Sequence, residues 1–257
     1  MQDPNGYSVR AVERALQILG CFDDEHPERG VSEIAQAVGL HKATTYRIVT
    51  TLLSCGYLER AADGLKYRLG LQLADLGFKV IRRMDLRREA LPHLAQLARR
   101  WDEACDLSVF DRGDVFYLEV IQGNHALTIA AAVGQRLPAH CTASGKLFLA
   151  YLPSHELAAF LSRPLVAYTD KTIVSPDELG QQLEAIRQRG YGLDDQEYEV
   201  GIRAVSAPIR NQAGAVVAAV SMASPTSRMT LDRIPDIAQA LREAAEAISR
   251  RLGWKTP

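Results

Sequence analysis

The chain has 257 residues, of which 47% are hydrophobic and 24% charged, and its formal net charge is −1. These values are ordinary for a globular protein of one large or two modest domains, and they exclude a disordered or fibrous chain. No stretch approaches the ~20 apolar residues that a membrane-spanning helix needs. The N-terminus lacks the basic and apolar segments of a secretory signal. We therefore expect a cytoplasmic protein with no membrane partner.

Basic residues are concentrated between residues 41 and 100. Residues 41–70 carry five Lys or Arg against two acids, residues 71–100 carry seven against three, and the remainder is acidic. A basic zone inside a nearly neutral chain is typical of a DNA-binding module joined to a domain that does not bind DNA. The alternative for part of this zone is an ordinary solvated helix face.

The first segment of the chain favours helices. Apolar residues recur at helical spacing from Ser8 to about Cys21. A second, short helix follows Gly30, with Glu33 in a capping position, and it ends at Gly39 in the manner of a left-handed C-terminal glycine. A third helix is expected from about His41 to Ser54.

A hairpin follows the third helix. Residues 57–60 and 65–69 have strand character, and Asp63-Gly64 between them is a strong turn signal. Two helices joined by a short turn and followed by a hairpin predict a winged helix-turn-helix over residues 8–70, a motif that binds double-stranded DNA.

The next segment predicts one long linker helix over residues 71–88. Its apolar residues Leu73, Leu76, Val80 and Met84 form a single stripe, which is typical of a dimer seam. Another helix follows, with Pro92 in its first turn or at a kink.

The remainder, residues 89–254, alternates strands and helices. Strands are expected at residues 106–111, 115–121, 127–133, 202–209 and 216–223, and helices at about 145–151, 155–161, 176–189 and 230–252. Hairpins with separated helices indicate an antiparallel sheet with helices packed on it. The expected fold class is therefore α+β.

Several motifs follow one another along the chain. They are VERALQIL at 12–19, GLHKATTYR at 39–47, YRLG at 67–70, PAHCTASGK at 138–146, GYGLDDQE at 190–197 and GIRAVSAPI at 201–209. In this order and spacing they resemble the IclR family of bacterial regulators over essentially the whole chain. The resemblance implies a homodimer or a dimer of dimers, a GAF-like effector domain and no catalysis.

The third helix carries the candidate DNA-reading residues. N-terminal side chains of this helix enter the major groove in the motif, where Arg and Lys donate to guanine and Thr contacts thymine or phosphate. The candidates are Lys42, Thr44, Thr45, Tyr46 and Arg47. The resemblance assigns DNA contact to Lys42, Thr44 and Arg47 and a backbone contact to Arg14. Lys66 and Arg68 of the wing are expected to position the duplex through phosphate or the minor groove.

Ala143, Ser144 and Gly145 form a candidate anion cradle. A phosphate loop is excluded because His140 stands where that motif needs a glycine, and no G-x-S-x-G motif makes Ser144 a nucleophile. Small residues that open a helix expose backbone N–H groups, which bind carboxylates. The alternative is a tight turn with no ligand.

The resemblance supplies the other effector-pocket residues: Ile129, Leu137, Asp194, Ile202, Ala204 and Ser221. Ala204 and Ala223 are less polar than their counterparts in some relatives, so we expect an aromatic or branched acid rather than a two-carbon acid. Asp194 would repel a carboxylate unless it is protonated, bridged by water or paired with a ligand hydroxyl.

The expected function is transcriptional regulation, with repression as the expected mode, through linkage between a small-molecule effector and operator DNA. No cofactor or metal is expected, because cysteine pairs and clustered His ligands are absent. Arg203 is expected to pair with Asp195 or Glu197. Two alternatives stay open. One is an enzyme that uses Cys105 or Cys141, and the other is a DNA-binding protein whose second domain only oligomerises.

Overall fold

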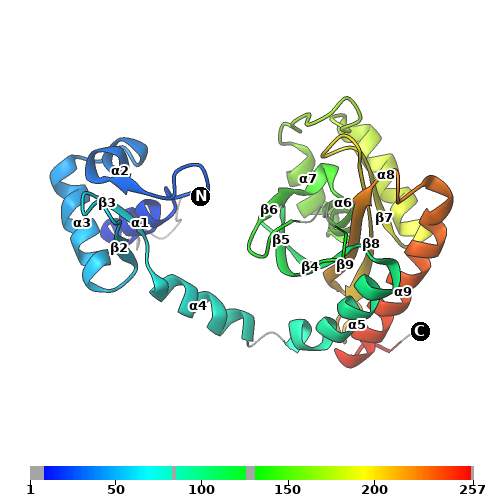
Figure 1. The fold of residues 1–257 in the computed structure, drawn as a ribbon. Helices are drawn as coiled ribbons and strands as arrows, with labels where there is room; N and C mark the ends of the chain where they lie inside the picture. The colour runs from blue at the N-terminus through cyan, green and yellow to red at the C-terminus, as the bar shows by residue number, and fades with distance from the viewer. Residues whose placement is uncertain (1–8, 83–84, 126–130, 256–257) are drawn as a thin grey trace. The chain divides into compact units, whose positions relative to one another are not determined.

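The structure is a computed structural model that describes residues 9–82, 85–125 and 131–255 (Figure 1). The chain divides into two units, Met1–Arg83 and Met84–Pro257. None of the helices in the described ranges is long and apolar enough to cross a membrane.

The first unit has the expected order of helices and hairpin. Its elements are α1 (Arg10–Leu19), β1 (Arg29–Gly30), α2 (Val31–Ala37), α3 (Lys42–Ser54), β2 (Leu58–Arg60), β3 (Lys66–Leu69) and α4 (Leu71–Arg82). Ile18, Ile34, Val49 and Tyr67 are buried together, so one core joins the three helices to the hairpin. The winged helix-turn-helix prediction is confirmed.

Local signals explain where these elements begin and end. The Glu33 carboxylate accepts a hydrogen bond from the Gly30 N–H at 2.6 Å, as a helix-capping acid does. Gly39 has a φ of 65°, the left-handed conformation that ends α2. In the hairpin turn, the Asp63 carboxylate accepts from the N–H groups of Leu65 and Lys66. The short strand β1, which pairs with β3, was not predicted.

One helix over residues 71–88 stays a prediction, because residues 83 and 84 lie outside the described part. On either side of them the structure has α4, which ends at Arg82, and α5 (Asp85–Trp101). The acid at Asp85 suits the first turn of a helix, because its charge complements the helix dipole. The side chains of Val80 and Met84 lie outside the described residues. Pro92 stands in the interior of α5 rather than in its first turn.

The second unit is an antiparallel sheet with helices on both faces. After α5 its elements are β4 (Ala104–Asp111), β5 (Asp114–Ile121), β6 (Arg136–Pro138), the 3-10 turn η1 (Ala139–Cys141), α6 (Ala143–Tyr151), α7 (Ser154–Leu161), α8 (Pro176–Arg189), β7 (Gly192–Asp195), β8 (Ile202–Arg210), β9 (Val216–Pro225), the 3-10 turn η2 (Leu231–Arg233) and α9 (Ile234–Arg251). The strands follow the order β6-β5-β4-β9-β8-β7. The α+β prediction is confirmed.

Two hydrophobic cores lie on opposite faces of this sheet. The helices α5 and α9 lie on one face (Figure 1). There Leu94 of α5 and Leu241 of α9 pack with Leu107 and Val220. On the other face, α6 lies against the sheet, and α7 and α8 contribute to the same core. The side chains of β9 alternate between the two faces, so Ser221, next to Val220, faces α6.

The strand expected over residues 127–133 is not observed. Residues 126–130 lie outside the described part, and residues 131–133 are not in a strand. The strand that pairs with β5 is β6, which begins after a turn at Gly134, where φ is 88°. The strand β7 was not predicted, because it is short and begins with glycine.

Two glycines allow α6 to approach its neighbours closely. A Cβ at Gly145 of α6 would overlap the backbone of Ala139, and a Cβ at Gly192 of β7 would overlap the carbonyl oxygen of Ala143. The start of α6 therefore rests on backbone atoms of η1 and β7. This contact sets the position of the first turn of α6 above the sheet.

We predict that Gly145→Ala lowers the free energy of unfolding of the second unit by about 1–3 kcal/mol, because the added methyl group must displace backbone atoms. Gly180→Ala is the matched control. Gly180 lies in α8 with nothing within 4 Å of an added Cβ, so this change should stabilise by about 0.4–1 kcal/mol. Urea titrations of both variants by circular dichroism measure the difference. Equal effects would contradict the close contact.

Candidate nucleic-acid interface and ligand pocket

The recognition helix α3 presents most of its predicted DNA-reading residues to solvent. Lys42, Tyr46 and Arg47 are exposed and Thr44 is half-buried. The opposite side of the helix carries Val49, which is fully buried. The first two turns of α3 therefore expose cationic side chains, while the opposite, apolar side of the helix packs into the core.

Thr45 does not belong to this surface. Its side chain is fully buried, and its Oγ1 donates to the carbonyl of His41 at 3.2 Å. Helical periodicity explains the error in the prediction, because Thr45 lies four residues before Val49 and so shares its core-facing side. The structure removes Thr45 from the candidate contacts.

Two surface depressions border α3 and bring the remaining candidates together. One is lined by Arg14 of α1 with Thr44, Tyr46 and Arg47. The other is lined by Lys42 and Tyr46 with Lys66 of the wing. Residues of α1 and of the wing, which are far apart in the sequence, thus border α3.

Arg68 of the wing is exposed but lies 3.3 Å from the Glu59 carboxylate. Surface ion pairs of this kind contribute little to stability. Because the Glu59 carboxylate lies beside it, the positive charge of Arg68 is partly neutralised in the free protein.

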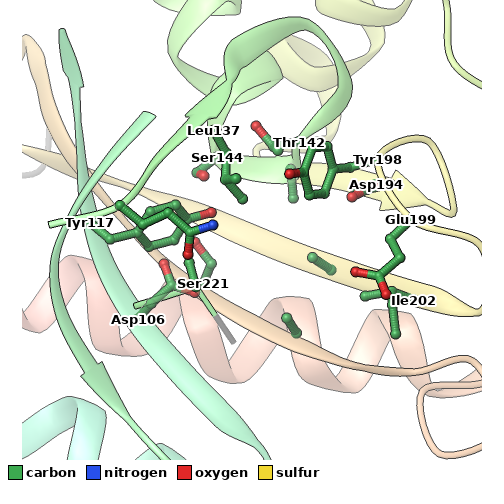
Figure 2. A pocket seen from close by; sticks show the side chains of 15 residues that line it. Asp106, Tyr117, Leu137, Thr142, Ser144, Asp194, Tyr198, Glu199, Ile202 and Ser221 are labelled. Atoms are coloured by element: carbon green, nitrogen blue, oxygen red, sulfur yellow. The ribbon is translucent and has the colours of Figure 1, made fainter. Parts of the chain in front are cut away.

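The second unit contains a cavity of about 130 Å³ between the α6-facing side of the sheet and the first turn of α6 (Figure 2). Seven residues of the predicted effector pocket line it: Leu137, Ala143, Ser144, Asp194, Ile202, Ala204 and Ser221. Ile129 lies outside the described residues. Gly145 does not line the cavity, because it faces Ala139, and its role here is steric.

Further lining residues were not predicted. They are Asp106, Tyr117, Ala131, Gln135, Thr142, Tyr198 and Glu199, together with Ala223, which entered the prediction only as a departure from relatives. Of these, Asp106 carried a detectable signal. It is a lone acid in the otherwise apolar start of β4, where a buried strand position is expected.

The first turn of α6 is open to an anion. Thr142, the N-cap residue, has extended backbone and gives no side-chain cap, because its Oγ1 donates to the Pro138 carbonyl at 2.9 Å. The first N–H groups of a helix have no partner within the helix and attract negative charge. Thr142, Ala143 and Ser144 line the cavity at this turn.

Two buried carboxyl groups also line the cavity. Burial raises the pKa of Asp106 to about 7, and the nearby Ser221 hydroxyl offsets only part of that rise. Burial likewise raises the pKa of Asp194 to about 7, although its Oδ1 accepts a hydrogen bond from the Glu197 N–H at 2.7 Å. Both groups are therefore protonated in a large fraction of molecules near neutral pH.

The cations near the cavity are paired with acids. Lys146 is 1% exposed and donates to the Glu197 carboxylate, which holds it away from the cavity. Arg203 pairs with Asp195 at 2.6 Å, which confirms one of its two predicted partners. Among the described residues, no Lys or Arg lines the cavity.

The cysteines do not support thiol chemistry. Cys105 and Cys141 are buried, and burial raises the pKa of both thiols. The nucleophile in thiol chemistry is the thiolate, which such an environment disfavours. In the described ranges, no group of three or more His, Cys, Asp or Glu side chains is arranged to hold a metal ion.

Comparisons with known proteins match nearly the whole chain. Residues 11–62 match the family described as the IclR helix-turn-helix domain, and residues 78–250 match the family described as bacterial transcriptional regulator IclR C-terminal. The chain is 35% identical to the HTH-type transcriptional regulator XynR of Escherichia coli (strain K12) over 247 residues, which covers 96% of this chain and 98% of that protein.

Solved structures agree with this match. The crystal structure of Thermotoga maritima IclR superposes with a TM-score of 0.75 at 32% identity, covering 95% of this chain and 99% of that one. An IclR homologue from Microbacterium hydrocarbonoxydans, crystallised with 4-hydroxybenzoate, gives a TM-score of 0.84 at 30% identity, covering 94% of this chain and 98% of that one.

We predict that Asp106→Asn gains stability relative to the native protein as pH rises. A carboxyl whose pKa is raised by folding binds its proton more tightly in the folded state, so its contribution is favourable at low pH and is lost as pH rises towards 7. Asparagine does not titrate. The free energy of unfolding of the variant minus that of the native protein should therefore increase by more than about 1 kcal/mol between pH 5 and pH 8.

Asp195→Asn is the control for this measurement. The pKa of Asp195 is lowered, since hydrogen bonds and charge from Gln196, Arg203 and Lys171 outweigh its partial burial. Asp195 is thus ionised in both folded and unfolded states above pH 5, and its variant should show a constant difference from pH 5 to pH 8. A flat difference for Asp106→Asn would show that Asp106 is already charged.

Proposed function

Because the chain belongs to the IclR family of bacterial transcriptional regulators, we propose that its first unit binds operator DNA and that an organic acid in the second unit changes the operator affinity. The family regulates transcription rather than catalysing a reaction, and this chain is a transcriptional regulator. The proposal of DNA binding rests on one observation, the grouping of four basic side chains around α3: Arg14, Lys42, Arg47 and Lys66.

Oligomerisation would place two recognition helices on a palindromic or repeated operator. Apolar side chains on the first unit support a second copy of the chain as partner: Leu16 of α1 is 63% exposed, and Leu71 and Leu76 of α4 are 77% and 41% exposed. Exposed large apolar groups of this kind mark association surfaces when they are contiguous. We propose a homodimer or a dimer of dimers that acts as a repressor.

The proposed effector is a carboxylate attached to a single ring or a branched chain. A cavity of about 130 Å³ is close to the ~150 Å³ of an engineered apolar cavity in another protein that binds benzene. Leu137, Ile202 and Ala223 offer an apolar wall, and the open first turn of α6 offers N–H groups to the carboxylate. The complex of a relative with 4-hydroxybenzoate supports the same class.

The effector acts by linkage in this proposal. A ligand changes operator affinity only to the extent that it binds the two conformations of the regulator with different affinity. Fluorescence anisotropy with DNA from upstream of the gene, at two salt concentrations and with a panel of organic acids, tests both parts. Specific binding altered by one acid is expected. Specific binding unaffected by every acid would overturn the effector part alone.

We predict that Arg47→Ala weakens operator binding at least tenfold and reduces the preference for operator over random DNA, because a base contact in the major groove is lost. Lys66→Ala should weaken binding to both DNAs and reduce the salt dependence by about one unit of slope. Arg250→Ala removes the same charge from an exposed residue of α9 and should change neither. Equal losses in all three variants would contradict the proposed interface.

We predict that benzoate affinity falls as pH rises through 7. Figure 2 shows Asp194 on the same side of the cavity as Thr142, so its ionised form would repel a carboxylate at the first turn of α6. Asp194→Asn should retain more of the low-pH affinity at pH 8 than the native protein does. Calorimetric titration at pH 6 and pH 8 measures both. An unchanged native affinity would show that Asp194 does not face the carboxylate.

A further inference from the structure

We propose that Asp106 and Ser221 form an acceptor subsite at the sheet side of the cavity, and that it binds a hydroxyl or amino group of the effector. The ligand class is then a ring acid that carries a hydrogen-bond donor away from its carboxylate. This inference rests on the proposed function, since it concerns the same cavity.

The sheet register brings the two residues together. Asp106 of β4 lies directly opposite Ser221 of β9, and Ser221 lies opposite Ser206 of β8. Residues paired in this way point to the same face of an antiparallel sheet, which here is the face under α6. Asp106 and Ser221 line the cavity, whereas Ser206 does not. Two central strands therefore hold the subsite rigidly.

The oxygens of this subsite are incompletely paired. Asp106 is 6% exposed and Ser221 3% exposed. The Ser221 hydroxyl lies close enough to the Asp106 carboxyl to lower its pKa, but no other described residue pairs with Asp106 Oδ1 or Ser221 Oγ. Buried polar atoms in folded proteins nearly always have a hydrogen-bond partner, because an unpaired buried acceptor costs free energy. An effector with an O–H or N–H group would supply the missing donor.

The groups that face Asp106 favour a hydrogen-bond donor over a carboxylate at this end. Tyr117 of β5 lies near Asp106, and its phenol is directed towards the Ser144 hydroxyl of α6. Asp194 of β7 lines the same cavity, and the Ser221 hydroxyl lowers the pKa of Asp106 by less than burial raises it. When Asp106 is ionised it would repel a carboxylate at this end, and no Lys or Arg in the cavity lining offsets the repulsion, whereas a donor group would meet an acceptor.

The two ends of the cavity thus recognise opposite chemistry. Figure 2 shows Asp106, Ser221 and Tyr117 grouped on one side, and Thr142, Tyr198 and Asp194 on another. Gln135 also lines the cavity, and its Oε1 accepts from the Ala132 N–H at 2.8 Å, which leaves its amide nitrogen as the group that would donate to a ligand. A hydroxyl could donate to Asp106 and accept from Gln135 at the same time.

Calorimetric titration of the full chain with substituted benzoates tests this subsite. The probes are benzoate, the three methylbenzoates, the three hydroxybenzoates and the three aminobenzoates. At one ring position, the hydroxyl or amino compound should bind at least tenfold more tightly than its methyl analogue, because a methyl group leaves the buried acceptor unpaired. Tighter binding of the hydroxybenzoate or of the aminobenzoate identifies which of the two donor groups the subsite binds.

Variants of Asp106 and Ser221 test whether these residues cause the preference for donor compounds over methyl compounds. In Asp106→Ala the ratio between donor and methyl compounds should fall to about one, and in the milder Ser221→Ala it should fall several-fold. Ser206→Ala removes a neighbouring unpaired hydroxyl outside the cavity and should keep the full ratio. Thermal unfolding of each variant verifies that it is folded.

The results separate this inference from the proposed function. If benzoates bind but donor and methyl compounds are equivalent, or if Asp106→Ala and Ser221→Ala both keep the preference, the subsite is wrong while the effector proposal stands. If no acid of the wider panel binds, the effector proposal fails and the subsite fails with it.

Discussion

The close contact between α6 and its neighbours is the constraint on which the second unit depends. Gly145 and Gly192 lack the side chains that would hold the first turn of α6 away from η1 and β7. The turn is thereby fixed above the sheet, and its residues Ala143 and Ser144 line the space between the two. Because small side chains such as Ala204 and Ala223 cover the sheet there, that space remains a cavity instead of being filled by the core.

The same packing determines the electrostatics of the cavity. The nearest buried ammonium group, that of Lys146, is committed to Glu197, and Arg203 is committed to Asp195. No basic group of the described residues forms an ion pair with Asp106 or Asp194, and burial raises the pKa of each, although the charge of Lys146 lowers that of Asp194 in part. Their neutral forms make the cavity polar without making it strongly charged, which suits a ligand that carries both an anion and a hydrogen-bond donor.

The sequence predicted elements well where local signals are strong. The helix α8 was placed at its observed bounds, because Ser175 caps it, Pro176 opens it and Gly190 ends it in a left-handed conformation. The prediction missed elements whose signal is tertiary. The short strands β1 and β6 were not predicted, because each is defined by its pairing with another strand, β3 and β5 respectively.

The same distinction applies to the candidate sites. Residues that belong to the motifs at α3 and α6 were identified, whereas Thr45 was included because motif membership does not reveal which side of a helix is buried. Asp106 was missed because its partner across the sheet, Ser221, lies more than a hundred residues away in the chain. Only the strand register brings the two together.

The burial of Thr45 has a consequence for how the specificity of this regulator could change. Since Thr45, Val49 and Leu52 anchor α3, the side chains that face away from the core are not needed to hold the helix in place. Positions 42, 46 and 47 can therefore be randomised together in a selection for new operators, at little expense to folding. The recognition surface is separable from its support, so DNA specificity could diverge between gene copies while the ligand response is kept.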